Sequence, residues 1–138
     1  MFSQVNETKM QKLNTWKTII AAEEASVGAS AGSNGYGAII TLADKDAKYL
    51  IMATNASDSS PAQVKIRAGN GINATTYEPA QTLGPGSTAL IQIESGCYKY
   101  VKDEGPMKVE SASDSIVGKV FLTTNSSAVK VKLIHMVM

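Results

Sequence analysis

The 138-residue sequence has one cysteine, one histidine and almost no imbalance of charge, and each shortage excludes a class of protein. Cys97 alone cannot form a disulfide within the chain, so it is a small buried hydrophobe, a free thiol or a link between subunits, and we expect burial. Thirteen basic and twelve acidic residues lack the positive excess of a nucleic-acid binder. No run approaches the roughly 18 apolar residues of a membrane span, and no signal-peptide pattern opens the chain. We therefore expect no nucleic-acid or membrane partner and a protein made in a bacterial cytoplasm.

Groups that carry catalysis or bind metals are equally scarce. His135 is the one histidine, and without ligand neighbours at metal-binding spacing it is interpreted as a structural residue at a sheet edge. Asp44 and Asp46 flank a lysine and lack the further oxygen ligands of a calcium loop. A glycosidase would need a pair of acids, and we expect the candidates to lie in turns or on polar strand faces, where acids are solvated. These candidates are Glu78, Glu94, Asp103, Glu104 and Glu110. We predict no enzyme, no metal and no cofactor.

Residues 1–36 differ from the rest of the chain. Residues 6–26 contain no glycine or proline, and their apolar side chains recur every three to four positions, which predicts a helix. Residues 26–37 contain four glycines and three serines, which indicates a flexible linker. We therefore divide the chain into an arm with its linker, 1–36, and a folded domain, 37–138.

From residue 38 the pattern changes to short segments of period two separated by turn signals. The expected strands are 38–43, 48–54, 62–68, 87–94, 97–101, 107–111, 115–123 and 128–137. No second helical pattern lies between them, which favours a sandwich or barrel over βαβ units. The prediction is an all-β, antiparallel β-sandwich, Ig-like or jelly-roll-like, with an N-terminal helical or extended arm.

The stretch "KIRAGNGINATTYEP", residues 65–79, has the spacing of the dinucleotide-binding fingerprint, but its context fails. That fingerprint needs a helix directly after the glycines, because the phosphates bind the free N–H groups at the helix start. Pro79 and the β-branched residues before it leave no room for such a helix. We therefore interpret Gly69, Asn70 and Gly71 as the positive-φ positions of a tight turn. Pro85 and Gly86 mark a second turn.

Four motifs follow one another in an order that resembles a known family. They are "DKDAKYLIMATNAS", "VKIRAGNGI", "TLGPGSTALIQIESGCYKY" and "GPMKVES". Over residues 44–122 the chain resembles the small β-sandwich proteins encoded among the head genes of tailed bacteriophages. The resemblance implies a structural virion protein that decorates or cements the capsid exterior, with the major capsid protein and its own copies as partners. A tail or baseplate component is an alternative.

Two further possibilities concern exposed apolar side chains. A carbohydrate-binding or adhesive sandwich would present aromatic residues, and Tyr36, Tyr77, Tyr98 and Tyr100 are available. Tyr98 and Tyr100 are predicted on one strand face, where we favour packing. In the arm, an apolar stripe is predicted to contact another subunit or to fold back over the domain; its residues are Met10, Leu13, Trp16, Ile19 and Ile20.

Overall fold

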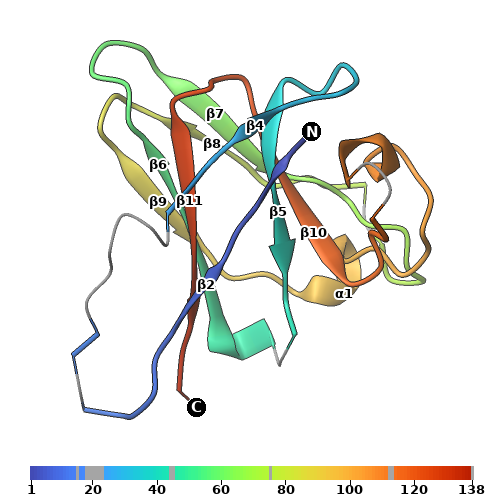
Figure 1. The fold of residues 1–138 in the computed structure, drawn as a ribbon, viewed down its shortest axis with the longest axis horizontal. Helices are drawn as coiled ribbons and strands as arrows, with labels where there is room; N and C mark the ends of the chain where they lie inside the picture. The colour runs from blue at the N-terminus through green and yellow to red at the C-terminus, as the bar shows by residue number, and fades with distance from the viewer. Residues whose placement is uncertain (15, 18–23, 44–45, 75, 112–113, 138) are drawn as a thin grey trace.

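The structure is a computed structural model, and it describes residues 1–14, 16–17, 24–43, 46–74, 76–111 and 114–137. This described part of the chain is nearly all β, with two mixed sheets and almost no helix (Figure 1). Sheet A contains β1 (Ser3–Gln4), β4 (Gly28–Ala29), β5 (Tyr36–Thr41), β7 (Ala62–Ile66), β8 (Ala80–Leu83) and β10 (Lys119–Thr124). Sheet B contains β2 (Glu7–Lys9), β3 (Ala25–Ser26), β6 (Tyr49–Asn55), β9 (Thr88–Ile91) and β11 (Val129–His135). Among the described residues, the helical pieces are α1 (Ser95–Tyr98) and the 3-10 turns η2 (Asp46–Lys48) and η3 (Lys108–Ser111).

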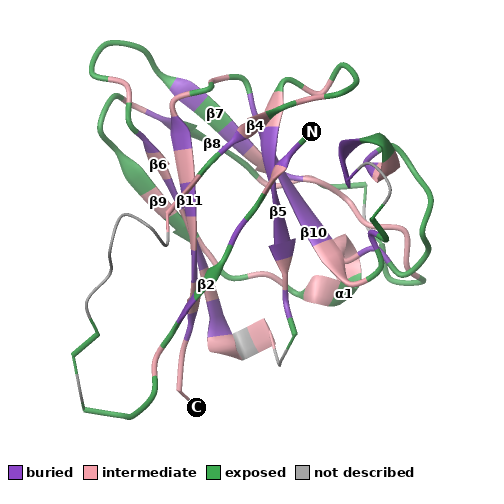
Figure 2. Ribbon diagram, viewed as in Figure 1, coloured by how far each residue is buried: buried purple, intermediate pink, exposed green. Residues whose placement is uncertain are grey.

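The centre of sheet B is the antiparallel pair β6 and β11, which is in register over seven residues from Val129 opposite Asn55 to His135 opposite Tyr49. Both strands alternate strictly between buried and half-buried residues, as Figure 2 shows. Period-two burial is the property that their sequences predicted. In sheet A, β10 lies between β5 and β7 and pairs antiparallel with both.

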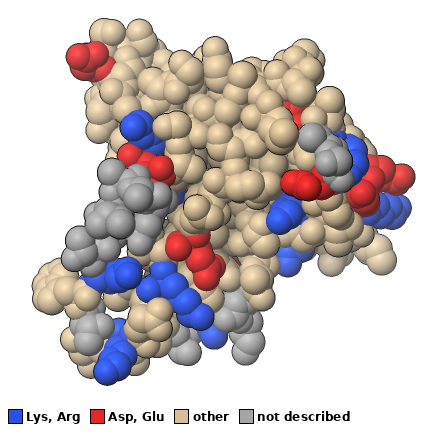
Figure 3. Space-filling model, in the orientation of Figure 1, with Lys and Arg blue, Asp and Glu red and all other residues tan. Residues whose placement is uncertain are grey.

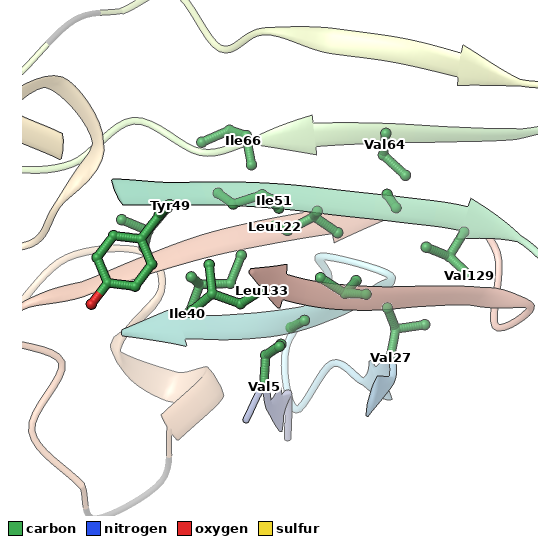
Figure 4. Packing of buried hydrophobic residues seen from close by; sticks show 14 of the residues in the cluster. Val5, Val27, Ile40, Tyr49, Ile51, Val64, Ile66, Leu122, Val129 and Leu133 are labelled. Atoms are coloured by element: carbon green, nitrogen blue, oxygen red, sulfur yellow. The ribbon is translucent and has the colours of Figure 1, made fainter. Parts of the chain in front are cut away.

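The main core draws its side chains from both sheets. Ile40 of β5 and Leu122 of β10 come from sheet A, and Ile51 and Leu133 come from sheet B (Figure 4). A second, smaller cluster surrounds Phe121, and the ring of Tyr100 packs edge-on against the Phe121 ring with centroids 5.4 Å apart. The other members of this cluster are Phe2, Ile39, Met107 and Ile116. Aromatic pairs prefer this edge-to-face arrangement.

Four short strands from the first 29 residues, β1 to β4, are the outermost strands on one side of the two sheets. β1 pairs parallel with β5 in sheet A, and β2 pairs parallel with β11 in sheet B. β3 then returns to sheet B and β4 to sheet A, where they pair antiparallel. The prediction of wholly antiparallel sheets is therefore wrong, because β1 and β2 run in the same direction as β5 and β11, with which they pair.

The helix predicted within residues 6–26 is wrong for the described part of that range. Residues 7–9 and 25–26 are the strands β2 and β3, while residues 15 and 18–23 lie outside the described residues. Thr8 is buried between the exposed Glu7 and Lys9, as in a strand. A short isolated helix is only marginally stable in water. Pairing with β11 supplies backbone partners instead.

Two other predicted strands are helical turns. Residues 97–101 begin inside α1, which is held by bonds from Cys97 N–H to Glu94 C=O and from Lys99 N–H to Ser95 C=O. The Asp46 carboxylate accepts the Ser95 N–H at 2.8 Å and anchors the start of this turn. Residues 107–111 end in η3, where the buried residues Glu110 and Ser111 are adjacent and do not alternate as in a strand. Strand β8 was not predicted, because three of its four residues are exposed and show no alternation.

Candidate functional site

The stretch "AGNG", residues 68–71, packs against the chain around α1 and does not form the predicted positive-φ turn. Positive φ is found elsewhere among the described residues, so the prediction for Gly69, Asn70 and Gly71 is wrong. Gly69 is required by close approach instead, since a Cβ there would lie 2.5 Å from Lys99 O. Gly69 N–H also donates to Cys97 C=O at 3.2 Å. The second and third family-like motifs thus meet through their backbones.

Asn70 uses its side-chain amide to hold the loop after Tyr100. Its Oδ1 accepts the N–H groups of Val101 and Lys102 at 2.8 and 3.2 Å. Its Nδ2 donates to the carbonyls of Lys102 and Glu104 at 3.0 and 2.9 Å. An asparagine can donate and accept at once, which aspartate cannot. This residue is therefore a brace between two loops rather than part of a ligand cradle.

Pro85 and Gly86 occupy the centre of a tight turn between β8 and β9. Ser87 N–H donates to Gly84 C=O at 3.0 Å, and Gly86 has φ of +75°. Proline at the second position and a positive-φ glycine at the third are the requirements of a type II turn. The turn carries the chain from sheet A to sheet B.

Arg67 and Glu78 form an ion pair beside the "AGNG" stretch. Glu78 Oε2 accepts Arg67 Nε and Ala68 N–H, both at 2.8 Å. Burial raises the pKa of the Glu78 carboxyl, but the Ala68 hydrogen bond and the Arg67 charge outweigh it and lower the pKa below 4.5. Glu78 is therefore a structural carboxylate.

The other acidic candidates do not converge. Glu110, expected to be solvated, is 0% exposed, and its carboxylate accepts Ser30 Oγ at 2.8 Å and Gly32 N–H at 3.3 Å. The Ile116 N–H and then Lys108 lower the pKa of Asp103. Glu94 and Glu104 are exposed, and Asp44 lies outside the described residues. Within the described ranges, no three His, Cys, Asp or Glu side chains gather as metal ligands would. No helix that the structure describes has the length and apolar character to cross a membrane.

His135 lies inside sheet B, so its predicted place at a sheet edge is wrong. Strand β11 has β2 on one side and β6 on the other. The imidazole is buried, stacks on the Tyr49 ring with centroids 4.4 Å apart and lies 3.3 Å from Glu7 Oε1. It thereby links three strands.

Cys97 and the strand placement of the two neighbouring tyrosines differ from expectation, whereas the packing favoured for both tyrosines is confirmed. Cys97 is half-buried on α1, with Sγ 3.9 Å from Glu94 Oε2. Tyr100 is buried in the smaller core cluster, whereas Tyr98 packs at the border of the main core. Since neither tyrosine lies in a strand, they do not share a strand face and form no aromatic platform there.

The predicted arm contacts fall on the loop that follows β2. Trp16 is 102% exposed, Leu13 is exposed and Met10 is half-buried, while Ile19 and Ile20 lie outside the described residues. The exposed Lys12 and Lys17 accompany them, and positive side chains gather over this part of the surface (Figure 3). The loop leaves the two sheets beyond β2 (Figure 1). A fully exposed tryptophan among lysines is typical of a contact surface rather than a core.

The side of the molecule formed by β8 and β9 is the other candidate surface. These strands end sheets A and B, and no strand of the described chain pairs with their outer sides. A cavity of about 180 Å³ lies behind them, lined mainly by apolar residues of both sheets. Leu90 belongs to this lining and is 58% exposed. The sequence prediction did not identify this side, since only the pairing order shows which strands are last.

Comparison with family models, curated proteins and solved structures gives no match for this chain.

Proposed function

We propose that this chain is a structural virion protein that decorates or cements the exterior of a tailed-bacteriophage capsid. Its partners would be the major capsid protein and its own copies. The observation that carries the proposal is the loop after β2, where Trp16 is 102% exposed and Leu13 is exposed beside lysines. The resemblance over residues 44–122 is the reason for proposing a bacteriophage capsid as the binding surface.

The proposal extends to the arrangement of the two sheets. We infer an Ig-like or jelly-roll-like β-sandwich, in which the sheets face each other across the main core. Buried residues from both sheets support this, such as Ile40 and Leu122 of sheet A with Ile51 and Leu133 of sheet B. Face-to-face sheets present loops and edges outward, and these are the parts available for contacts with neighbouring proteins.

The loop chemistry suggests how it would dock. Trp16 and Leu13 would enter an apolar pocket, while Lys12 and Lys17 would lie against acidic groups around it. Tryptophan is enriched among the residues that contribute most to interfaces. Binding through one loop can be weak, because many copies on one lattice gain effective concentration from contacts with each other.

The proposal predicts saturable binding to heads that lack the protein, at a fixed ratio to the major capsid protein. Purified chain is mixed with such heads, the particles are pelleted, and bound protein is measured against concentration and salt. We expect Trp16→Ala to weaken binding by about tenfold or more. Added salt should weaken it further, because the lysines are exposed.

Val117→Ala is the matched control, since Val117 is also an exposed apolar residue but lies in the turn before β10. Equal loss for both variants would argue against the loop as the docking element. Failure to bind heads, with copurification in tails, would favour the tail or baseplate alternative.

A further inference from the structure

Strand β9 directs part of its backbone away from the sheet. Asn55 N–H donates to Ser87 C=O at 2.9 Å, just before β9 begins. Bonded and non-bonded pairs alternate along an antiparallel ladder, so the N–H and C=O groups of Thr88 and Leu90 point outward from β6. Such outward groups form a template for a further strand.

No charged residue, proline or bulge interrupts β9, which is four residues long. Natural edge strands are interrupted by charged side chains, proline or bulges. β9 has the sequence TALI, and residues 79–93 contain no charged residue. Leu90 is 58% exposed and borders the cavity of about 180 Å³. An uncharged edge beside an apolar opening favours a polypeptide partner over solvent.

We propose that β9 pairs antiparallel with β9 of a second copy of this chain across a twofold axis, which joins the two B sheets. The inference rests on the self-association in the proposed function and assigns it a surface. A second copy fits the charge of the edge, because residues 79–93 then face an equally uncharged segment. Glu94 would lie opposite the Gly84–Gly86 turn, so no like charges meet.

The outward groups determine the register. Hydrogen bonds between the two copies form only where residues with outward backbone groups lie opposite each other. One register uses Thr88 and Leu90 of both copies, with Thr88 of one copy opposite Leu90 of the other. Ala89 then lies opposite Ala89 of the second copy in a non-bonded pair, with Cα atoms about 4.5 Å apart. That separation lies within the range of a disulfide, about 4.4–6.8 Å.

Sedimentation of the purified full chain from about 1 μM to about 1 mM tests the pairing without heads. We expect a reversible dimer that Leu90→Lys weakens by about tenfold or more, because lysine is a residue with which natural edge strands oppose pairing. Val109→Lys is the matched control, since Val109 is 49% exposed on η3, far from β9 in Figure 1. It should leave the dimer unchanged.

A crosslinking variant covers the case in which Leu90→Lys fails to fold. In a Cys97→Ser background, the Ala89→Cys variant should form a covalent dimer on mild oxidation, whereas Cys97→Ser alone should not. A wild-type chain that stays monomeric overturns the inference, as does equal behaviour of the two lysine variants or absence of the crosslink. A chain that dimerises through β9 but binds no heads would support this inference and contradict the proposed function.

Discussion

Replacing Gly69 by alanine should destabilise the protein, although the change adds one methyl group. The new Cβ would lie 2.5 Å from Lys99 O and 2.7 Å from Tyr98 C, and both are backbone atoms. That backbone cannot easily move, because Tyr100 N–H donates to Lys119 C=O and Tyr100 C=O accepts Gly118 N–H. Overpacking of this kind costs about 1–3 kcal/mol. Strain on the bond from Gly69 N–H to Cys97 C=O adds to that cost.

An opposing term comes from the unfolded state, where alanine has less freedom than glycine and returns about 0.4–1 kcal/mol. We therefore expect Gly69→Ala to lower the free energy of unfolding by about 1–3 kcal/mol, or Tm by about 3–5 °C per kcal/mol. Urea unfolding followed by far-ultraviolet circular dichroism measures it. Trp16 is fully exposed, so its fluorescence is a poor reporter.

Gly71→Ala is the matched control two residues away. Its Cβ would meet the Val101 methyl groups at 3.5 and 3.6 Å, which is ordinary contact. Neither Gly69 nor Gly71 has positive φ, so backbone strain cannot separate the variants. We expect Gly71→Ala to change stability by less than about 0.5 kcal/mol. Equal effects at the two positions, or a stabilised Gly69→Ala, would refute close approach as the reason for Gly69.

Asn70→Asp keeps the oxygen that accepts Val101 N–H but loses the donor to Glu104 C=O, so we expect a loss of about 1–2 kcal/mol. Hydrogen exchange at Val101 should stay slow in Asn70→Asp and become fast in Asn70→Ala; the same rate in both would contradict the brace. For Glu78, whose pKa is lowered below 4.5, the stabilisation by the Ala68 N–H and by Arg67 is present above the unfolded pKa and lost as pH falls through the folded one. Wild type should therefore lose more stability than Glu78→Gln between about pH 5 and pH 3, as measured by urea unfolding, and parallel curves would exclude the pair as the cause.

The sequence by itself determined the elements whose signal is local. Strands β6, β7 and β11 alternate in burial as they alternate in polarity, because a strand buried on one face needs apolar residues at every second position. The turn at Pro85 and Gly86 was equally visible, since the two residues restrict their own torsions.

Only the tertiary structure decided the rest, because the deciding partners are distant in the chain. Glu7–Lys9 is a strand on account of β11, where Leu133 lies opposite Glu7 and is 126 residues later, and helical periodicity in residues 6–26 carries no information about that pairing. Glu110 is buried because the loop at Ser30 supplies its hydrogen bonds. The open side at β8 and β9 follows from strand order alone. The local sequence determines which backbone torsions a segment favours. Its strand pairing and burial depend on which backbone groups from distant parts of the chain form hydrogen bonds with it.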